Sequence, residues 1–475
     1  MRNKTFGLTL IAAAMILSGC TTLAPEYERP AAPIAQAWPQ DLATQNVRVL
    51  TNGLAQWGEF FQDERLRSLI QQGLENNRDL RVSALNVEKA RALYNVSRGQ
   101  LLPSVAAVAD EAAKGTPAEF SSSGQRTTTH VYTASAAMAS YELDLFGRVR
   151  NLNEQALQQY MATEAAQRTA QMTVITEIAQ TWLGLGAAKA QKALALETLN
   201  SQEKSRELIE KSYELGAASQ LDVQQVLTTV ASAKAAYVQA TRTVSQYRNA
   251  LTLLVGSAVD PALEPDGIVS NAAAQVSALS GVPSEVLLAR PDIAAAEAAL
   301  KAANANIGVA RAAFFPRIAL TAAVGTTSAE LSNLFDAGTR FWSFAPQISL
   351  PIFTGGQNTQ NLKAAQAEQK AAVASYERAI QSAFREVADA LAIEGTVSEE
   401  LKARQELAQA TEASYRLAQA RYQNGADSYF QVLDSQRTHF SAQQALISAQ
   451  LAQVASRVTL YKVMGGGSQL QNGEN

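Results

Sequence analysis

The stretch 421-RYQNGADSYFQVLDSQRTHF-440 decides the fold, because it repeats an element that the chain has used before, in 211-KSYELGAASQLDVQQ-225. Glycine often follows the last residue of a helix, so each stretch predicts a helix, a glycine turn and a second helix. Asp434 of the second stretch stands where the first has Gln225. The residues shared at a constant separation of 209 positions are Tyr213 and Tyr422, Gly216 and Gly425, Ala217 and Ala426, and Ser219 and Ser428.

The repetition extends beyond these turns. The segment LNVEKARALYNVSRGQLLPSV, residues 85–105, matches AALKAANANIGVARAAFFPRI, residues 298–318, with Pro103 aligned to Pro316. Matches that keep nearly the same separation indicate one unit present twice. We therefore expect an internal two-fold repeat over residues 77–256 and 290–464, with three segments outside it: 20–76, 257–289 and the Gly-rich tail 465–475.

Each repeat predicts a helix that ends at a proline, then a β-hairpin, at about 103–145 and about 316–353. Each strand is about 10 residues long, which is the length of a tilted transmembrane strand. The alternative is a pair of surface hairpins on a soluble domain. In the second hairpin, the residues predicted to alternate with neighbours on the other face of the strand are Ile318, Leu320, Ala322 and Val324, then Trp342, Phe344, Ile348 and Leu350. In the first hairpin they are Val105, Ala107 and Ala109, then Val131, Thr133, Tyr141 and Leu143.

The segments 148–212 and 357–421 contain no proline. Each predicts a helix of about 65 residues and about 100 Å, with Gly184 and Gly186 as the weak points of the first. A shorter helix returns after each glycine turn. Rods of this length, with apolar residues repeating every 3.5 to 3.6 positions, must pack on other rods, and one chain has too few of them to close a core.

The strands also require more than one copy of the chain. Four strands per chain leave open edges, and lipid cannot satisfy unpaired backbone groups. Two chains would give about 8 strands and a barrel filled by side chains, whereas three would give about 12 and leave a lumen. We therefore predict an α+β membrane protein whose chains share one trimeric, 12-stranded transmembrane β-barrel.

The first 20 residues, MRNKTFGLTLIAAAMILSGC, carry two basic residues followed by a short apolar run. This pattern predicts a cleaved signal peptide over residues 1–19. The ending Leu17-Ser18-Gly19-Cys20 is typical of a lipobox, in which the cysteine receives lipid, and Cys20 is the only cysteine of the chain. Acyl chains there would anchor the protein in a membrane. The alternative is a plain signal peptide with a chance cysteine.

Charge and motif content argue against several function classes. Removal of residues 1–19 takes away Arg2 and Lys4, so the 40 basic residues become 38 against 43 acidic ones, and no basic patch predicts nucleic-acid binding. The two histidines, His130 and His439, have no third ligand at a metal spacing. The phosphate-loop-like GLGAAK, residues 184–189, follows no strand. We expect no enzyme activity, no metal and no cofactor.

Five motifs resemble the TolC-like outer-membrane efflux factors, in particular the lipoprotein, OprM-like branch, and the resemblance covers residues 17–467 in order. It implies a trimer with a 12-stranded outer-membrane β-barrel, a 12-helix periplasmic α-barrel and a mixed equatorial domain. It also implies a duct through which drugs or other small toxic solutes leave the cell. The motifs are YELDLFGRVR, ANIGVARAAFFPRIALT, WSFAPQISLPIFTGG, SAFREVADALA and LYKVMGGG.

The same resemblance implies roles for residues near the two glycine turns, which it places at the periplasmic tip. Asp434 matches an acidic entrance ring, and Phe430 an apolar constriction. Asp222 and Tyr422 match a pair whose hydrogen bond closes the entrance. Gln431 stands where some relatives have a second acidic ring, and Asp427 where some have a basic lock residue. The residues implied to contact an adaptor are Gly216, Ala217, Gly425 and Ala426.

The partners implied are two further copies of the chain, a periplasmic adaptor, an inner-membrane transporter of the resistance-nodulation-division type, and outer-membrane lipids. Thr21, after the lipobox cysteine, lacks the acidic character of an inner-membrane retention signal, so the outer membrane is the expected location. Two alternatives stay open: a duct for type I secretion of polypeptides, and a lipid-anchored helical scaffold that forms no channel. For Asp222 and Asp434, the alternative is that each is an ordinary solvated charge on a helix.

Overall fold

The computed structural model describes residues 22–35, 56–274 and 284–466. The signal peptide, Cys20 and parts of the predicted equatorial and tail segments lie outside this range. The chain divides into two compact units, each described by itself: residues 1–31, 87–163 and 295–376 form unit 1, and residues 32–86, 164–294 and 377–475 form unit 2. Among the described residues, none of the helices is both long and apolar enough to cross a bilayer.

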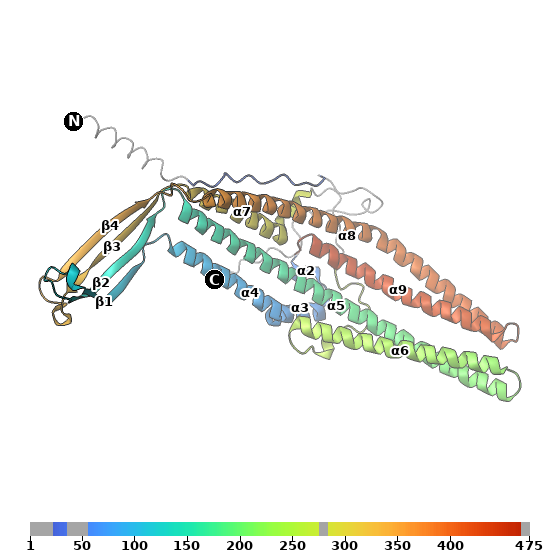
Figure 1. Ribbon diagram of the computed structural model, residues 1–475. Helices are drawn as coiled ribbons and strands as arrows, with labels where there is room; N and C mark the ends of the chain where they lie inside the picture. Colours follow the sequence, from blue (N-terminus) through green and yellow to red (C-terminus); the bar gives the residue numbers. More distant parts are fainter. Residues whose placement is uncertain (1–21, 36–55, 275–283, 467–475) are drawn as a thin grey trace. The chain divides into compact units, whose positions relative to one another are not determined.

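One order of elements occurs twice along the chain: helix, two strands, long helix, returning helix (Figure 1). Both long helices have 67 residues, close to the predicted length. The first run comprises α4 (Arg78–Gly99), β1 (Val105–Thr116), β2 (Thr127–Leu143), α5 (Arg148–Glu214) and α6 (Gln220–Val255). The second comprises α7 (Pro291–Ala312), β3 (Arg317–Ser328), β4 (Arg340–Ser349), α8 (Gln357–Gln423) and α9 (Tyr429–Val463).

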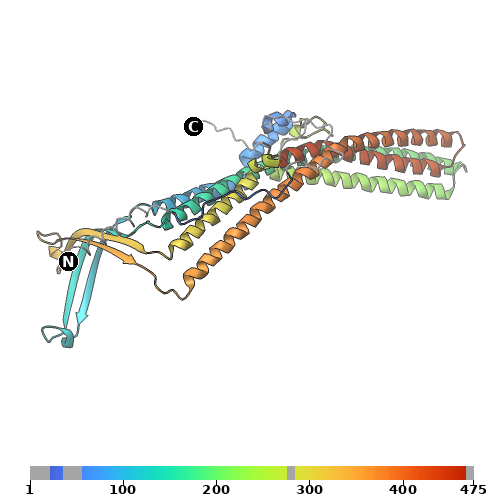
Figure 2. The same ribbon diagram turned by 90° about the horizontal axis from the view of Figure 1, so that it is seen from above.

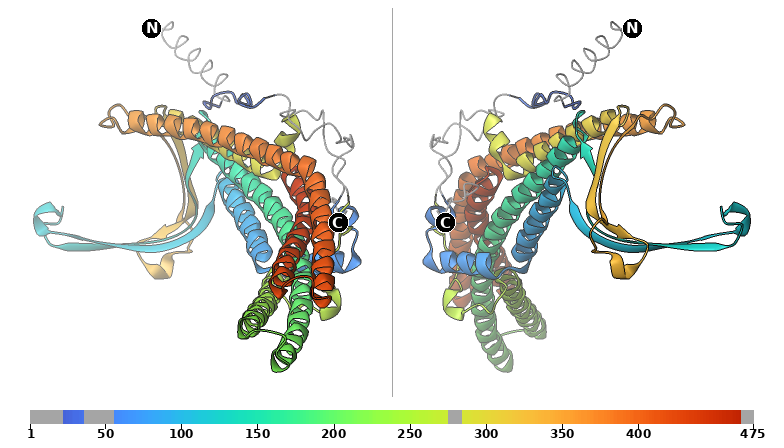
Figure 3. Two further views of the ribbon diagram at one scale, coloured as in Figure 1. Left: turned by 90° about the vertical axis from the view of Figure 1, so that its right-hand side faces the viewer. Right: turned by 90° about the vertical axis from the view of Figure 1, so that its left-hand side faces the viewer.

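Unit 1 contains one four-stranded antiparallel sheet in the order β1-β2-β3-β4, so β1 and β4 are its edges (Figure 1). The predicted alternation of the second hairpin is correct, because the register places Ile318 opposite Ile348, and Val324 opposite Trp342. Directly opposed residues share a face, so one face of the second hairpin is apolar. In Figure 3 the β1–β2 hairpin extends beyond the other two strands.

The alternation predicted for the first hairpin is wrong on β2. The register between β2 and β3 shifts between Met138 and Tyr141, and Ser140 there has a positive φ of 51°. A bulge of this kind adds a residue and changes which residues face each side. Tyr141 and Leu143 therefore share the apolar face with β3, whereas Val131 and Thr133 lie on the opposite, more polar face.

The N-terminal segment 22–30 of unit 1 is held along α7 by side chains. Glu297 of α7 accepts hydrogen bonds from the Tyr27 hydroxyl at 3.2 Å and from the Arg29 guanidinium at 3.0 Å. Arg311, near the end of α7, donates to the carbonyl of Leu23 at 3.0 Å. These pairs join residues more than 260 positions apart in the sequence, so the start of the described chain is tied to the second repeat.

Unit 2 contains two antiparallel helix hairpins. The first joins α5 to α6 and the second joins α8 to α9, and both turns lie at the same end of the unit (Figures 1 and 2). Figure 3 shows the two pairs end on. Buried Ile209 and Val226 of the first hairpin pack with Tyr429 and Val432 of the second, so the two turns belong to one packed tip.

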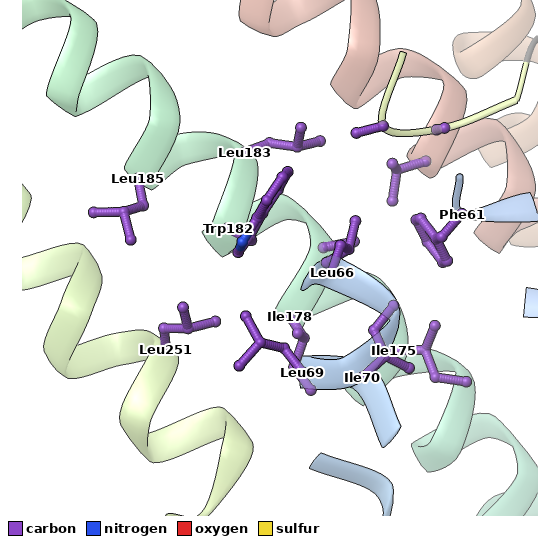
Figure 4. Packing of buried hydrophobic residues seen from close by; sticks show 14 of the residues in the cluster. Phe61, Leu66, Leu69, Ile70, Ile175, Ile178, Trp182, Leu183, Leu185 and Leu251 are labelled. Atoms are coloured by element: carbon purple, nitrogen blue, oxygen red, sulfur yellow. The ribbon is translucent and has the colours of Figure 1, made fainter. Parts of the chain in front are cut away.

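The main core of unit 2 lies where α5 meets α3 (Glu64–Asn76), which follows the short α2 (Trp57–Phe60) (Figure 4). The side chain of Asp63 caps α3 by accepting from the backbone N–H groups of Arg65 and Leu66. Phe61 pairs with Ala273 in an isolated bridge. The largest fully buried side chains of this core are Trp182, Tyr461, Phe61, Leu66, Leu69, Ile70, Ile178, Leu185 and Leu251.

The two glycines predicted as weak points do not interrupt α5, which is continuous from Arg148 to Glu214. A Cβ atom at Gly184 would collide with the Tyr247 ring, and one at Gly186 with the backbone carbonyl of Gly267. Glycine is needed at both positions because other parts of the chain come too close for a side chain. The prediction of weak points is therefore wrong.

Candidate functional site

The two glycine turns of unit 2 are built in the same way. Gly216 and Gly425 have φ values of 73° and 72°. The N–H of Gly216 bonds to the carbonyl of Tyr213, and that of Gly425 to Tyr422, both at 2.9 Å. The N–H groups of Ala217 and Ala426 reach one residue further back, to Ser212 and Arg421. This is the Schellman arrangement, which favours glycine at its left-handed position.

The two turns present open backbone. A Cβ atom added at Gly216 or Gly425 would meet nothing within 4 Å, and both residues are exposed. The side chain of Asp427 forms an ion pair with Arg421 across the second turn, with Nε and Oδ2 2.6 Å apart. The Arg421 guanidinium also holds the pKa of the Asp427 carboxyl below its ordinary value. In this chain Asp427 therefore stabilises its own turn.

The two helices that follow the turns, α6 and α9, differ in their N-terminal caps. Ser219 and Asp222 form a capping box at the start of α6: Ser219 accepts from the Asp222 N–H, and Asp222 Oδ2 accepts from the Ser219 N–H at 2.8 Å and from its hydroxyl at 2.7 Å. At the start of α9 the corresponding Ser428 makes no side-chain capping bond. The first tip hairpin therefore has a stronger cap than the second.

We expect Ser219→Ala to lower the local stability of the first turn of α6 by about 1 kcal/mol, because the cap is lost. Ser428→Ala is the matched control, since this serine caps nothing, and it should leave α9 almost unchanged. Amide hydrogen exchange in the first turns of α6 and α9 measures both effects. Equal changes in the two helices would contradict the assignment of the cap.

Asp222 and Tyr422, predicted to close the entrance as a pair, come near each other in one chain. Burial, followed by the negative charge of Asp222, raises the pKa of the Tyr422 hydroxyl. Within the described chain, however, the Asp222 carboxylate is hydrogen-bonded to Ser219 and not to Tyr422. The two side chains are thus neighbours, and the cap of α6 already uses Asp222.

Tyr429, which sequence reasoning missed, lies at the centre of the tip. Its side chain is buried, and its ring centroid lies 5.4 Å from that of Tyr422. Burial, together with the nearby Tyr422, Tyr415 and Asp222, raises the pKa of the Tyr429 hydroxyl to about 12. The sequence spacing gives no signal for this position, because Tyr415 and Tyr422 lie on α8 whereas Tyr429 begins α9 beyond the glycine turn.

Phe430 and Asp434 lie one turn apart on α9, as predicted, and the Phe430 side chain is exposed. Sequence reasoning missed Arg437, one turn further along. Its Nη2 lies 2.7 Å from Asp434 Oδ1, and the two side chains are 81% and 44% exposed. Because their spacing of three residues brings side chains together on a helix, the sequence contained this signal. Asp434 is therefore charge-paired within its own chain.

The described residues contain no group of three or more His, Cys, Asp or Glu side chains placed to hold a metal ion. His130 of β2 lies 2.8 Å from Glu111 of β1, and His439 of α9 lies 3.3 Å from the Thr411 hydroxyl. The chemistry that the tip offers is therefore that of charge, aromatic surface and hydrogen bonding.

Comparisons with known proteins agree on one family. The family model described as "Outer membrane efflux protein" matches residues 69–257 and 282–466. The chain is 44% identical over 470 residues to the probable efflux pump outer membrane protein TtgC of Pseudomonas putida, covering 98% of this chain and 96% of that protein. It is 42% identical over 467 residues to the outer membrane protein OprJ of Pseudomonas aeruginosa, covering 98% and 97%.

Solved structures give the same result. A membrane protein from Pseudomonas aeruginosa superposes with a TM-score of 0.87 at 41% identity, covering 94% of this chain and 98% of that one. The open state of the MtrE outer membrane channel from Neisseria gonorrhoeae gives a TM-score of 0.83 at 38% identity, with coverage of 94% and 99%.

Proposed function

Because this chain belongs to the outer membrane efflux protein family and is an outer-membrane channel protein of an efflux pump, we propose that it works as a homotrimeric exit duct. In this arrangement each chain contributes four strands to a 12-stranded transmembrane barrel and its helices to a 12-helix periplasmic barrel, with a mixed equatorial region. The family and the relatives are named as efflux proteins, which supports a role as a channel component without enzyme activity.

The observation that carries this proposal is the pattern of the sheet in unit 1. One face is apolar over a band that crosses all four strands and includes Val105, Met138, Leu320 and Phe344. Glu111 and His130 lie on the same face further along β1 and β2. The edge strands β1 and β4 have no partner on their outer sides among the described residues. Lipid would surround the apolar face, and only other copies of the sheet can close the edges within a bilayer.

The repeated order of elements supports an internal two-fold repeat. The two segments that the family model matches, 69–257 and 282–466, each contain one complete run of helix, hairpin and helix pair. Three chains with two copies each would build a duct of approximate sixfold symmetry. A heterologous contact of this kind closes into a ring when its rotation fits.

We place the closed entrance at the tip. Asp434 would form the acidic ring and Phe430 the apolar constriction, while Asp222 and Tyr422 would hold neighbouring helices together. The turns at Gly216, Ala217, Gly425 and Ala426 would receive the hairpin of a periplasmic adaptor, because the space around the two glycines is open. An inner-membrane transporter of the resistance-nodulation-division type would deliver the solute through that adaptor.

The protein is located in the outer membrane, as its family is, and we propose lipid anchoring through Cys20, which lies outside the described residues. The names of the relatives refer to efflux pumps, which supports small-solute efflux over the two alternatives. A type I secretion duct would share the architecture but pass polypeptides. A helical scaffold would have no use for the apolar sheet.

Expression with its adaptor and pump should restore drug resistance to a host that lacks its own outer-membrane efflux channel. The full chain is compared with a variant lacking β4, which cannot close a barrel. Minimum inhibitory concentrations and dye accumulation measure the result. Secretion of a polypeptide without any gain in resistance would favour the type I duct instead.

Asp434→Asn should reduce the cation preference of the purified trimer, and Arg437→Gln should increase it, because Arg437 offsets the charge of Asp434. A unit charge about 4 Å from an ion contributes about 1 kcal/mol in water, which corresponds to about a fivefold change in local ion concentration. Reversal potentials in planar bilayers measure both. Unchanged selectivity in both variants would exclude Asp434 from the ion path.

A further inference from the structure

A cavity of about 470 Å³ lies in the tip of unit 2, between the α5–α6 hairpin and α9. Its volume is in the range of sites that hold drug-sized ligands. We call it the tip cavity. Its lining includes Gln202 of α5, Gln225 and Thr228 of α6, and Asp434, Gln436 and Arg437 of α9, with the rings of Phe430 and Phe440.

Two buried carboxamides line this cavity with unused hydrogen-bonding capacity. Gln436 is only 7% exposed, and its side chain has no hydrogen bond to any described residue. Gln202 is 5% exposed, and its Oε1 accepts from the Thr229 hydroxyl at 2.9 Å, which leaves its amide N–H groups without a partner in the described chain. None of their polar atoms is both fully buried and unpaired, so they remain accessible from the cavity and can pair with carbonyl or N–H groups of a ligand.

Charge and apolar surface add to this preference. The Asp434–Arg437 ion pair lines the same cavity and presents one negative and one positive group side by side. Phe430, Leu433 and Phe440 supply apolar surface from the same helix. The counterparts of Asp434 and Arg437 in the first repeat, Gln225 and Thr228, line the cavity from α6 and are uncharged. The charges therefore lie on one wall only, which orients a ligand that carries both signs.

We propose that the tip cavity binds small aromatic solutes that carry both a cationic and an anionic group. The ammonium group lies near Asp434, the carboxylate near Arg437, and the ring against Phe430 and Phe440, while Gln436 and Gln202 pair with the polar groups of the ligand. The cavity is a holding site for solute next to the entrance, and in this respect the inference rests on the proposed function.

Norfloxacin is a suitable probe, because it is a fluorescent aromatic compound with a piperazinium and a carboxylate. Fluorescence anisotropy with the purified full chain in detergent measures its binding. We expect saturable binding that Gln436→Leu weakens about fivefold, as the loss of one hydrogen bond predicts, and that Arg437→Gln weakens similarly. N-acetylnorfloxacin, which has lost the cation, should also bind about fivefold more weakly.

Gln444→Leu is the matched control, since Gln444 is exposed on the same helix two turns further along, and it should bind norfloxacin like the unmodified chain. Circular dichroism and the mass of the trimer check folding. If Gln436→Leu does not fold, Arg437→Gln decides the matter, because the Arg437 side chain is 81% exposed and its loss leaves the packing intact.

Two results would overturn the inference: an absence of saturable binding, as expected if a neighbouring copy fills the cavity in the trimer, or equal binding by Gln436→Leu, Arg437→Gln and the control. Neither result bears on efflux, which is measured separately in cells by drug resistance. A chain that restores resistance but does not bind norfloxacin contradicts only this inference, and a chain that binds norfloxacin but restores no resistance contradicts the proposed function.

Discussion

Replacing Glu264 with leucine is expected to lower the free energy of unfolding by about 3 kcal/mol. Glu264 is 7% exposed, and its carboxylate accepts from Arg248 at 2.8 Å and lies 2.8 Å from Lys189 Nζ. Leucine would leave Arg248 and Lys189 without the buried carboxylate that they share. Because Arg248 is half exposed, water offsets part of the loss, so we expect the lower end of the range known for broken buried pairs.

The same carboxylate predicts a dependence on pH. Burial alone would raise its pKa, but the hydrogen bonds from Arg248 and Lys189 hold the pKa of Glu264 below its ordinary value of 4.5. A folded-state pKa below the unfolded one means that the stabilisation is present above the unfolded pKa and is lost as the pH falls through the folded pKa. Glu264→Leu should therefore destabilise the protein at pH 7 and have much less effect at pH 3.

Guanidinium unfolding in detergent, followed by helical circular dichroism at a fixed protein concentration, measures both effects. Asp266→Ala is the matched control, because Asp266 is an acidic residue of the same loop whose side chain is 97% exposed. Exposed ion pairs contribute little, so this variant should differ from the unmodified chain by less than about 1 kcal/mol. A similar loss in both variants would show that the charge of the loop matters and that the burial of Glu264 does not.

Local sequence patterns were sufficient for the elements and for the turns. The helix bounds follow from proline and glycine, whose effects act within a few residues, and the φ values of Gly216 and Gly425 are those that the repeated motif predicts. The faces of β3 and β4 follow from an alternation of period two. These features could be predicted because each depends on neighbours along the chain.

Features that depend on distant parts of the chain could not be predicted. The bulge at Ser140 reverses the faces within β2, and no turn residue marks it. The burial of Tyr429 requires two hairpins that are about 200 residues apart in the sequence to meet. Arg437 is different, since its spacing from Asp434 was visible, but spacing alone does not show whether a charge pairs or stays free.

For the glycines of α5, the local rule that glycine weakens a helix gives the wrong prediction. Residues 182, 186 and 189 lie on one stripe of the helix, and each contacts the loop 263–267. The indole N–H of Trp182 donates to the carbonyl of Leu263 at 2.9 Å. Gly186 lies against the carbonyl of Gly267, and Lys189 pairs with Glu264. Gly186 is therefore the point of closest approach between the helix and the loop.

Gly186→Ala is accordingly expected to destabilise the protein by about 2 kcal/mol, because the new methyl group would displace a backbone carbonyl. Helix propensity predicts the opposite sign, since alanine favours a helix interior over glycine by about 1 kcal/mol. The sign of the change therefore decides between the two effects. Guanidinium unfolding measures the free energy, and Trp182 fluorescence reports whether the loop has moved.

Two other glycines provide graded controls for this prediction. A Cβ atom at Gly184 meets the Tyr247 ring, which can rotate more easily than a backbone carbonyl can shift, so Gly184→Ala should cost less than Gly186→Ala. A Cβ atom at Gly99 meets nothing within 4 Å, so Gly99→Ala should be neutral or slightly stabilising. If all three variants gain stability, helix propensity outweighs the close approach, and the loop 263–267 does not pack on α5 as tightly as the structure indicates.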